Sequence, residues 1–262
     1  MNSIEEIYLW VAVLLGTLIG SFLNVVIYRL PRKESLVWPG SHCPVCGKPI
    51  HPRDNLPVVS FIMLRGRCRG CGTRISRRYP IVEAVNGLAY GLIVWYFGPG
   101  GQAVVYAALF SALLVISYID FDHQIIPDVI TLPGIGVGIL AASTLLPTGL
   151  VNSISGLLLG GGVLLLLAWV SPYLFGKEGM GGGDIKLLAM IGAFLGWQAV
   201  ILTMLIGAIV GATVGVSLMA FRILRRDQYL PFGPFLAFGA IVSMFFHEEL
   251  FSWYVTFLAL PQ

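Results

Sequence analysis

The chain has 262 residues, of which 57% are hydrophobic and only 11% are charged. This composition and the mean hydropathy of +0.86 exclude an ordinary soluble domain and predict a membrane protein with several spans. The net charge of +3 is small, and membrane topology accounts for its distribution, so it does not indicate a nucleic-acid partner.

Eight apolar stretches are candidates for crossing a bilayer, which takes a helix of about 20 residues. They run from 8 to 29, 81 to 97, 102 to 119, 127 to 146, 153 to 175, 185 to 197, 199 to 221 and 232 to 258. The first lacks the basic flank and small cleavage-site residues of a secretory signal, so we expect a retained span. The border between the sixth and the seventh lies near Gly196 and Trp197. We therefore expect an all-α polytopic membrane protein with about eight transmembrane helices.

The loop between the first two spans carries most of the positive charge. Eleven of the 16 Lys and Arg residues lie between Arg29 and Arg78, where only two acidic residues oppose them. The positive-inside rule places this loop in the cytoplasm, with anionic lipid headgroups as its default neighbours. We expect a first span (1–30), a loop domain (31–80) and a membrane domain (81–262). Eight spans would then put these residues on the cytoplasmic side: Asp120, Lys177, Asp184, Arg222, Arg225 and Arg226.

The same loop contains all the cysteines of the chain, in two CxxC pairs separated by 21 residues. Each pair is followed by a glycine, Gly47 or Gly72, which suits a tight turn. Such pairs are typical of a structural zinc site that is closed by four thiolates and has no position left for a catalytic water. The predicted ligands are Cys43, Cys46, Cys68 and Cys71.

Other roles for the cysteines are less consistent with the sequence. Disulfides are disfavoured in a cytoplasmic loop, and thiol redox chemistry normally uses one CxxC pair. His42 and His51 are alternative metal ligands near the pairs. A loop of about 50 residues has too small a core to be stable easily, so a bound metal would contribute to its folding.

Three carboxylates follow the apolar stretch 102–119: Asp120, Asp122 and Asp128. A carboxylate at membrane depth costs roughly 3 kcal/mol, so it suggests a function. Pro127 disfavours helix in the residue before it, so one helix should end here and another begin. Asp128 would complement the dipole of that new helix, and Asp122 lies further from the apolar stretch. We favour Asp120, because desolvation helps it to hold a proton.

A second aspartate, Asp184, follows four glycines within five residues and precedes another apolar helix. Glycines allow the backbone to approach a helix or an extended substrate closely. The alternative is a flexible hinge with an aspartate helix cap. Phosphate binding is not indicated, since the GxxxxGK[ST] pattern is absent. Together, Asp120 and Asp184 suggest an aspartic dyad.

These features occur in the order found in a known family. They are Gly20-Ser21-Phe22-Leu23-Asn24 and the residues up to Pro31, the CPxCG and CRxCG pairs, Asp54-Asn55-Leu56-Pro57, Arg78-Tyr79-Pro80-Ile81-Val82-Glu83, the Asp120 segment with Ile126-Pro127-Asp128, and Gly181-Gly182-Gly183-Asp184. The chain resembles the bacterial type IV prepilin leader peptidases, also called prepilin peptidase/N-methyltransferases.

The resemblance implies a GxGD-type aspartic protease of the bacterial inner membrane, with Asp120 and Asp184 as its catalytic pair. In such a pair the ionised carboxylate activates water and the protonated one polarises the scissile carbonyl. The implied substrates are prepilins or pseudopilins, cleaved between a basic cytoplasmic leader and an apolar helix. The resemblance also implies methylation of the new N-terminus by S-adenosylmethionine. Glu83 is a candidate base or orienting group, and Arg65-Gly66-Arg67 is a candidate surface with lipid contact as its alternative.

Two functions of other classes remain open. A proton-coupled transporter would also place aspartates near glycine-broken helices, although no internal repeat is evident. A scaffold whose zinc loop recruits partners would explain the cysteines but not the paired aspartates. The sequence does not indicate which residues bind the methyl donor. It does not indicate the oligomeric state either.

Overall fold

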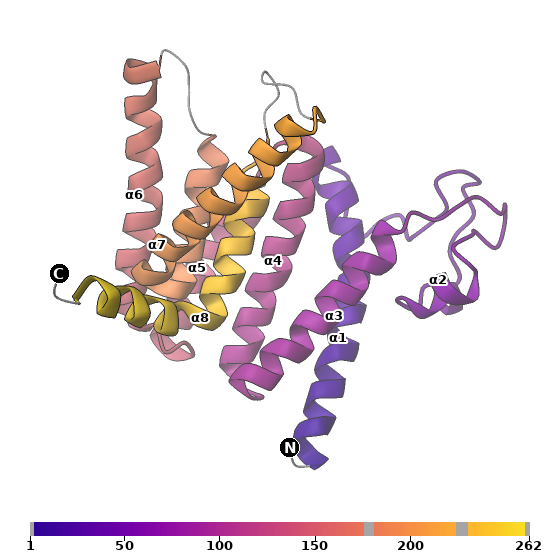
Figure 1. Cartoon of the computed structure of the whole chain (residues 1–262). Helices are drawn as coiled ribbons and strands as arrows, with labels where there is room; N and C mark the ends of the chain where they lie inside the picture. The colour runs from indigo at the N-terminus through magenta and orange to yellow at the C-terminus, as the bar shows by residue number, and fades with distance from the viewer. Residues whose placement is uncertain (1–2, 176–180, 224–229, 260–262) are drawn as a thin grey trace. The chain divides into compact units, whose positions relative to one another are not determined.

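A computed structural model describes residues 3–175, 181–223 and 230–259 (Figure 1). Within these ranges the chain is helical, and its only β-type pairings are two isolated bridges in the loop between α1 and α3. This confirms the all-α class. The helices are α1 (Ser3–Arg29), α2 (Val59–Met63), α3 (Arg78–Phe97), α4 (Gly101–His123), α5 (Asp128–Thr144), α6 (Gly149–Phe175), α7 (Gly182–Ala220) and α8 (Gly233–Ala259). Of the residues placed by prediction on the cytoplasmic side, Lys177, Arg225 and Arg226 lie outside the described residues.

Six of the described helices are long and apolar enough to cross a membrane, and α5 is a shorter apolar helix. The count differs from eight for two reasons: α7 unites the sixth and seventh expected spans, and α5, the fourth, is shorter than the others. Within α7, Gly196 has non-helical backbone angles (φ 84°, ψ 177°), at the border that the sequence suggested. A positive φ of this kind is accessible to glycine at little cost.

The chain reverses direction at Gly196, so α7 is a helical hairpin with two legs (Figure 1). A Cβ atom on Gly183, at the start of α7, would lie 2.8 Å from Cβ of Ile126. A Cβ atom on Gly215, near its end, would lie 3.7 Å from Leu230, just before α8. Both ends of α7 therefore lie near the C-terminal end of α4 and the N-terminal end of α8.

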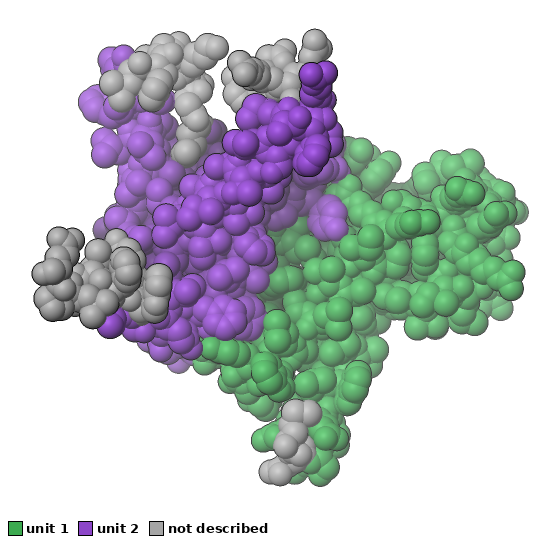
Figure 2. Space-filling view, in the orientation of Figure 1, with its two compact units in different colours: residues 1–115 green, residues 116–262 purple. Residues whose placement is uncertain are grey.

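The chain divides into two compact units, residues 1–115 and 116–262 (Figure 2). In the first unit, α1 and α3 pack closely through glycines. A Cβ atom on Gly20 would lie 2.8 Å from Cα of Glu83, and one on Gly16 would lie 2.8 Å from the Asn86 carbonyl oxygen. The Asn86 amide donates a hydrogen bond to the Gly16 carbonyl at 2.8 Å and accepts one from Ser111 at 2.9 Å. Small residues and an internal polar contact thus join these helices, as is common in membranes.

The second unit is built around the first leg of α7, in which every residue from Leu187 to Gly196 is buried. Glycines also bring its helices together. A Cβ atom on Gly156 of α6 would lie 2.5 Å from the carbonyl oxygen of Gly192, and one on Gly207 would lie 3.1 Å from that of Phe235. This leg begins two residues before Asp184, so the core of the unit fixes where that aspartate stands. The predicted division into residues 1–30, 31–80 and 81–262 remains a prediction.

Candidate functional site

Asp120 lies in the last turn of α4, and only 5% of its surface is exposed. Its Oδ2 atom accepts a hydrogen bond of 2.9 Å from the backbone N–H of Gly233, the first residue of α8. A carboxylate suits this position, because the N–H groups at a helix start carry partial positive charge. Gly233 also provides space, since a Cβ atom there would lie 2.6 Å from the same oxygen.

Asp184 stands in the first turn of α7 and is half-buried. Its N–H donates to the Gly181 carbonyl at 3.2 Å, and a Cβ atom on Gly181 would lie 3.4 Å from its Oδ2. The two carboxyl groups are close enough to interact electrostatically. Asp120 and Asp184, 64 positions apart in the sequence, are therefore neighbours in the structure.

Ile126 links the segments that carry the two aspartates. A Cβ atom on Gly183 would lie 2.8 Å from Cβ of Ile126, and one on Gly233 would lie 3.3 Å from its Cδ1. The segment reaches this place because α4 ends at His123, where Gln124 takes a left-handed conformation (φ 55°) and donates to the Asp120 carbonyl at 2.8 Å. Pro127 then precedes α5, which confirms the expected helix end and restart.

The other two carboxylates lie at the surface. Asp122 is exposed. Asp128 begins α5, as expected, and both of its oxygens accept from Nζ of Lys186, at 2.8 and 2.7 Å. Lys186 lies two residues beyond Asp184 in α7. The ion pair thus ties the start of α5 to the start of α7, a role that the sequence did not indicate.

The four cysteines form one cluster, in which all the Sγ atoms lie within 4.8 Å of one another. The Sγ atoms of Cys43 and Cys71 are 3.9 Å apart, and all four thiols are free of disulfides. Four sulfurs at about 2.3 Å from a tetrahedral zinc ion would be about 3.8 Å apart, so the cluster fits such an ion. Neither His42 nor His51 belongs to it within the described residues.

Both CxxC segments fold as tight turns of the same kind. The N–H of Gly47 donates to the Cys43 carbonyl, and that of Gly72 donates to the Cys68 carbonyl, each at 2.9 Å. Both glycines have positive φ values, 67° and 71°, which confirms why glycine follows each pair. The turns direct the thiols of each pair to one point.

The thiols differ in acidity because their surroundings differ. Backbone hydrogen bonds from Cys46 and Val45 lower the pKa of the Cys43 thiol to about 6. For Cys71 a backbone hydrogen bond from Thr73 acts in the same direction. It is outweighed by burial and by the neighbouring thiols, so the pKa of Cys71 is raised to about 11. A divalent cation would relieve this crowding, since it binds thiolates.

Glu83, the candidate for methyl transfer, is buried in α3 with 8% of its surface exposed. Its Oε2 atom accepts a hydrogen bond of 2.7 Å from the backbone N–H of Val58, and Ser21 is a second hydrogen-bond partner. Val58 has a positive φ of 59°, which is unusual for a β-branched residue. Glu83 therefore ties the loop to the helices, and its part in methyl transfer stays a prediction. Arg65 and Arg67 are exposed.

Two family models match the chain: the bacterial peptidase A24 N-terminal domain over residues 14–97, and the type IV leader peptidase family over residues 107–216. A protein of Pseudomonas aeruginosa named prepilin leader peptidase/N-methyltransferase is 38% identical, over 94% of this chain and 92% of that protein. This chain belongs to the type IV leader peptidase family.

Other relatives in the family carry the same name. The protein of Aeromonas hydrophila is 36% identical over 97% of this chain and 96% of its own length. That of Burkholderia pseudomallei is 39% identical over 90% of this chain and 84% of its own length. No solved structure matches the chain. With its apolar helices, the chain is a multi-pass inner-membrane enzyme of the leader peptidase family.

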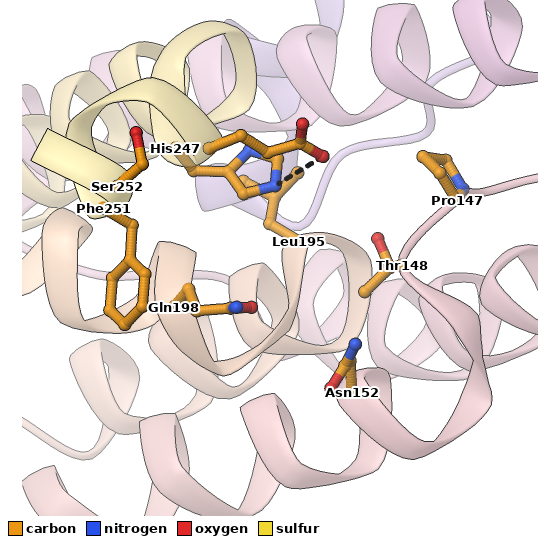
Figure 3. Close-up of a pocket in the computed structure, with 9 residues that line it drawn as sticks. Pro147, Thr148, Asn152, Leu195, Gln198, His247, Phe251 and Ser252 are labelled. Carbon is orange, nitrogen blue, oxygen red and sulfur yellow. Dashed lines mark ion pairs between the residues drawn. The ribbon is translucent and has the colours of Figure 1, made fainter. Parts of the chain in front are cut away.

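A separate cavity of about 350 Å³ lies beside the turn of α7 (Figure 3). His247 and Glu248 line it, with their side chains 3.9 Å apart. Leu195 also lines it, eleven residues along the first leg of α7 from Asp184, which corresponds to roughly 16 Å of helix. The cavity therefore does not belong to the aspartate site of this leader peptidase.

Proposed function

We propose that this leader peptidase removes the leader from type IV prepilins or pseudopilins with Asp120 and Asp184, and N-methylates the residue that becomes N-terminal. The observation that carries the proposal is that the end of α4, which carries Asp120, and the start of α7, which carries Asp184, lie together around Ile126 and Gly233. The relatives' name supports both activities. The transporter alternative has no such support, because both matching families are peptidase families.

The dyad would act as a unit on the scissile peptide. The two groups share a proton, since neighbouring carboxylates do not both ionise easily, and the pair titrates together. The ionised carboxylate takes a proton from the attacking water, and the protonated one donates to the carbonyl oxygen. Gly233 keeps the Asp120 carboxylate in a fixed orientation, because its N–H holds Oδ2 at 2.9 Å. This arrangement needs no metal at the aspartates.

Charge supports a cytoplasmic position for the dyad. The loop at residues 29–78 contains eleven of the 16 basic residues, which favours the cytoplasm for the end of α1 and the start of α3. If α5 and both legs of the α7 hairpin each cross the membrane, the ends of α4 and α8 that meet at Asp120 would lie on the same face as this loop. A basic leader that precedes an apolar helix would meet the aspartates there.

Zinc and S-adenosylmethionine have different roles in the proposal. Zinc would be held by Cys43, Cys46, Cys68 and Cys71 and would stabilise the loop rather than take part in chemistry, since its four ligands leave no open position. S-adenosylmethionine would supply the methyl group. Glu83 remains the candidate to orient or deprotonate the amine.

The test compares the purified full-length protein with its Asp120→Asn and Asp184→Asn variants. Each is incubated in detergent with a prepilin, and leader removal is followed by intact mass. Asp122→Asn is the matched control, because it changes a neighbouring exposed carboxylate of the same segment. We expect cleavage by the wild type and the control, and none by either dyad variant. Cleavage that survives in Asp120→Asn or Asp184→Asn would refute the dyad.

Methylation is measured in the same experiment by adding S-adenosylmethionine. A further mass increase of one methyl group on the cleaved product supports the second activity. A cleaved product whose mass does not change would limit the proposal to the peptidase.

A further inference from the structure

The segment that follows α1 is held against the end of that helix by the side chain of Arg29. The guanidinium donates to the Ser35 carbonyl at 2.9 Å and to the Pro39 carbonyl at 2.7 Å, and Arg29 is only 8% exposed. The backbone contributes as well, because the N–H of Glu34 donates to the Arg29 carbonyl at 3.1 Å. The chain from residue 30 to 39 therefore curls back to the end of the first span instead of extending away from it.

This ordered turn exposes two large apolar side chains. The Ser35 hydroxyl accepts hydrogen bonds from the N–H groups of Val37 and Trp38, at 3.3 and 3.2 Å. These two residues remain 84% and 78% exposed. A turn that is fixed by five hydrogen bonds but leaves a tryptophan and a valine uncovered is a surface built to meet an apolar partner.

The place of the turn indicates which partner. The candidate span runs from Ser3 to Arg32, so the turn lies within side-chain reach of the end of a membrane-crossing helix. The Cζ atom of Arg32 lies 4.1 Å from the centre of the Tyr28 ring, in the last turn of that helix. Such an aromatic and cationic pair is typical of the membrane–water interface. Arg32 and Lys33 are both exposed beside the turn. Lys33 and Arg32 precede Trp38 by five and six residues, and the exposed Glu34 is the one acidic residue between them. An exposed tryptophan near such cations favours the headgroup region of anionic lipids.

We propose that Val37 and Trp38 form an interfacial anchor, which inserts into the headgroup region of an anionic bilayer beside α1. The anchor holds the start of the four-cysteine loop against the membrane. The inference does not depend on the proposed peptidase or methyltransferase chemistry, because it concerns only α1 and the turn after it.

The test uses tryptophan fluorescence of the full-length protein in nanodiscs that contain anionic phosphatidylglycerol, with one protein in each disc. The contribution of Trp38 is the difference between wild type and Trp38→Phe. Lipids brominated near the headgroup end of their acyl chains serve as the quencher. We expect this difference signal to be quenched and blue-shifted relative to the same signal in unfolded protein.

Arg29→Lys tests whether the turn builds the anchor. Lysine keeps the charge but lacks the planar fork that reaches two carbonyls at once, so quenching of Trp38 should fall at least twofold. Arg77→Lys is the matched control, because Arg77 is an exposed arginine of the same loop that lies outside the turn, and it should retain the wild-type quenching. Zinc content verifies that the loop is folded in each variant.

Three results would overturn the proposal. Trp38 emission that is not quenched in the nanodiscs would exclude contact with lipid. Quenching that disappears on adding a prepilin, together with a blue shift, would identify the substrate as the preferred occupant. Burial of Trp38 that is seen only when two proteins share a disc would identify a second copy of the chain.

Discussion

The two adjacent glycines before Asp184 are expected to respond very differently to the same substitution. In Gly183→Ala the added Cβ atom would lie 2.8 Å from Cβ of Ile126, an atom joined directly to the backbone that cannot rotate away. In Gly182→Ala the added atom meets nothing within 4 Å. Both residues lie in the first turn of α7, so the change in helix propensity is the same in both variants. Any difference between the variants therefore comes from the contact with Ile126.

The size of the effect follows from the required movement. Carbon atoms in ordinary contact are about 3.5–4.0 Å apart, so Gly183→Ala must separate Ile126 from α7 by roughly 1 Å. Overpacking of this kind costs about 1–3 kcal/mol of stability, and a displacement of about 1 Å between catalytic groups costs on the order of 100-fold in rate. We expect kcat for leader removal to fall about 100-fold in Gly183→Ala and to change less than about twofold in Gly182→Ala.

Leader removal is measured by intact mass at saturating prepilin, and thermal unfolding is recorded for the same samples. The unfolding curves identify a variant that is inactive only because it does not fold. Gly183→Ala with more than about a tenth of the wild-type kcat would refute the reasoning, since a displacement of about 1 Å between catalytic groups should cost on the order of 100-fold in rate. So would an equal loss in the two variants.

Three further predictions concern charges and metal. In Lys186→Met, loss of the exposed ion pair with Asp128 should lower stability by only about 0.2–1 kcal/mol and kcat by up to about fivefold. A double variant that exchanges Lys186 and Asp128 should restore kcat. If it does not, the ion pair has no positioning role. Arg69 donates two hydrogen bonds to Asp54, and hydrogen bonding by Arg69 is the main cause that lowers the pKa of that carboxyl. This stabilisation is present above the pKa of the unfolded carboxyl and is lost as pH falls through the lowered value, so the Tm difference between wild type and Asp54→Asn should shrink in acid. A Tm difference that is constant with pH would contradict it. Wild-type protein should contain about one zinc per chain by elemental analysis and Cys43→Ser much less, with methylation impaired more than cleavage; equal zinc in both would exclude the site.

Local patterns in the sequence predicted much of this fold. Apolar runs located the helices, Pro127 marked the restart at α5, and Gly47 and Gly72 marked the two cysteine turns, because each depends on residues within a few positions. The break at Gly196 was visible only as an uncertain border. A glycine inside an apolar run is compatible with both a straight helix and a hairpin, and only tertiary packing decides between them.

The contacts that complete the aspartate site could not be predicted in this way. Gly233 donates to Asp120 across 113 positions of sequence, and Lys186 pairs with Asp128 across 58. A single sequence contains no distances between such segments. The expected span from 232 to 258 located α8, but the carboxylate that the start of this helix binds comes from another helix. Asp120 and Asp184 were found because a carboxylate beside an apolar span is costly enough to need a reason.

The glycines near the dyad divide into two groups by what surrounds them. Gly183 and Gly233 are required by neighbours, since a side chain on either would displace Ile126 or the Asp120 carboxylate. Gly181 and Gly182 are exposed, and Gly182 has open space where its side chain would be. Packing therefore explains the first group but not the second. An extended peptide that approaches Asp184 would pass this exposed backbone, whose free surface allows close contact without a side chain in the way. On this reasoning Gly182→Ala should leave kcat intact, whereas a bulkier Gly182→Leu should raise KM for the prepilin, and an unchanged KM would place the substrate path elsewhere.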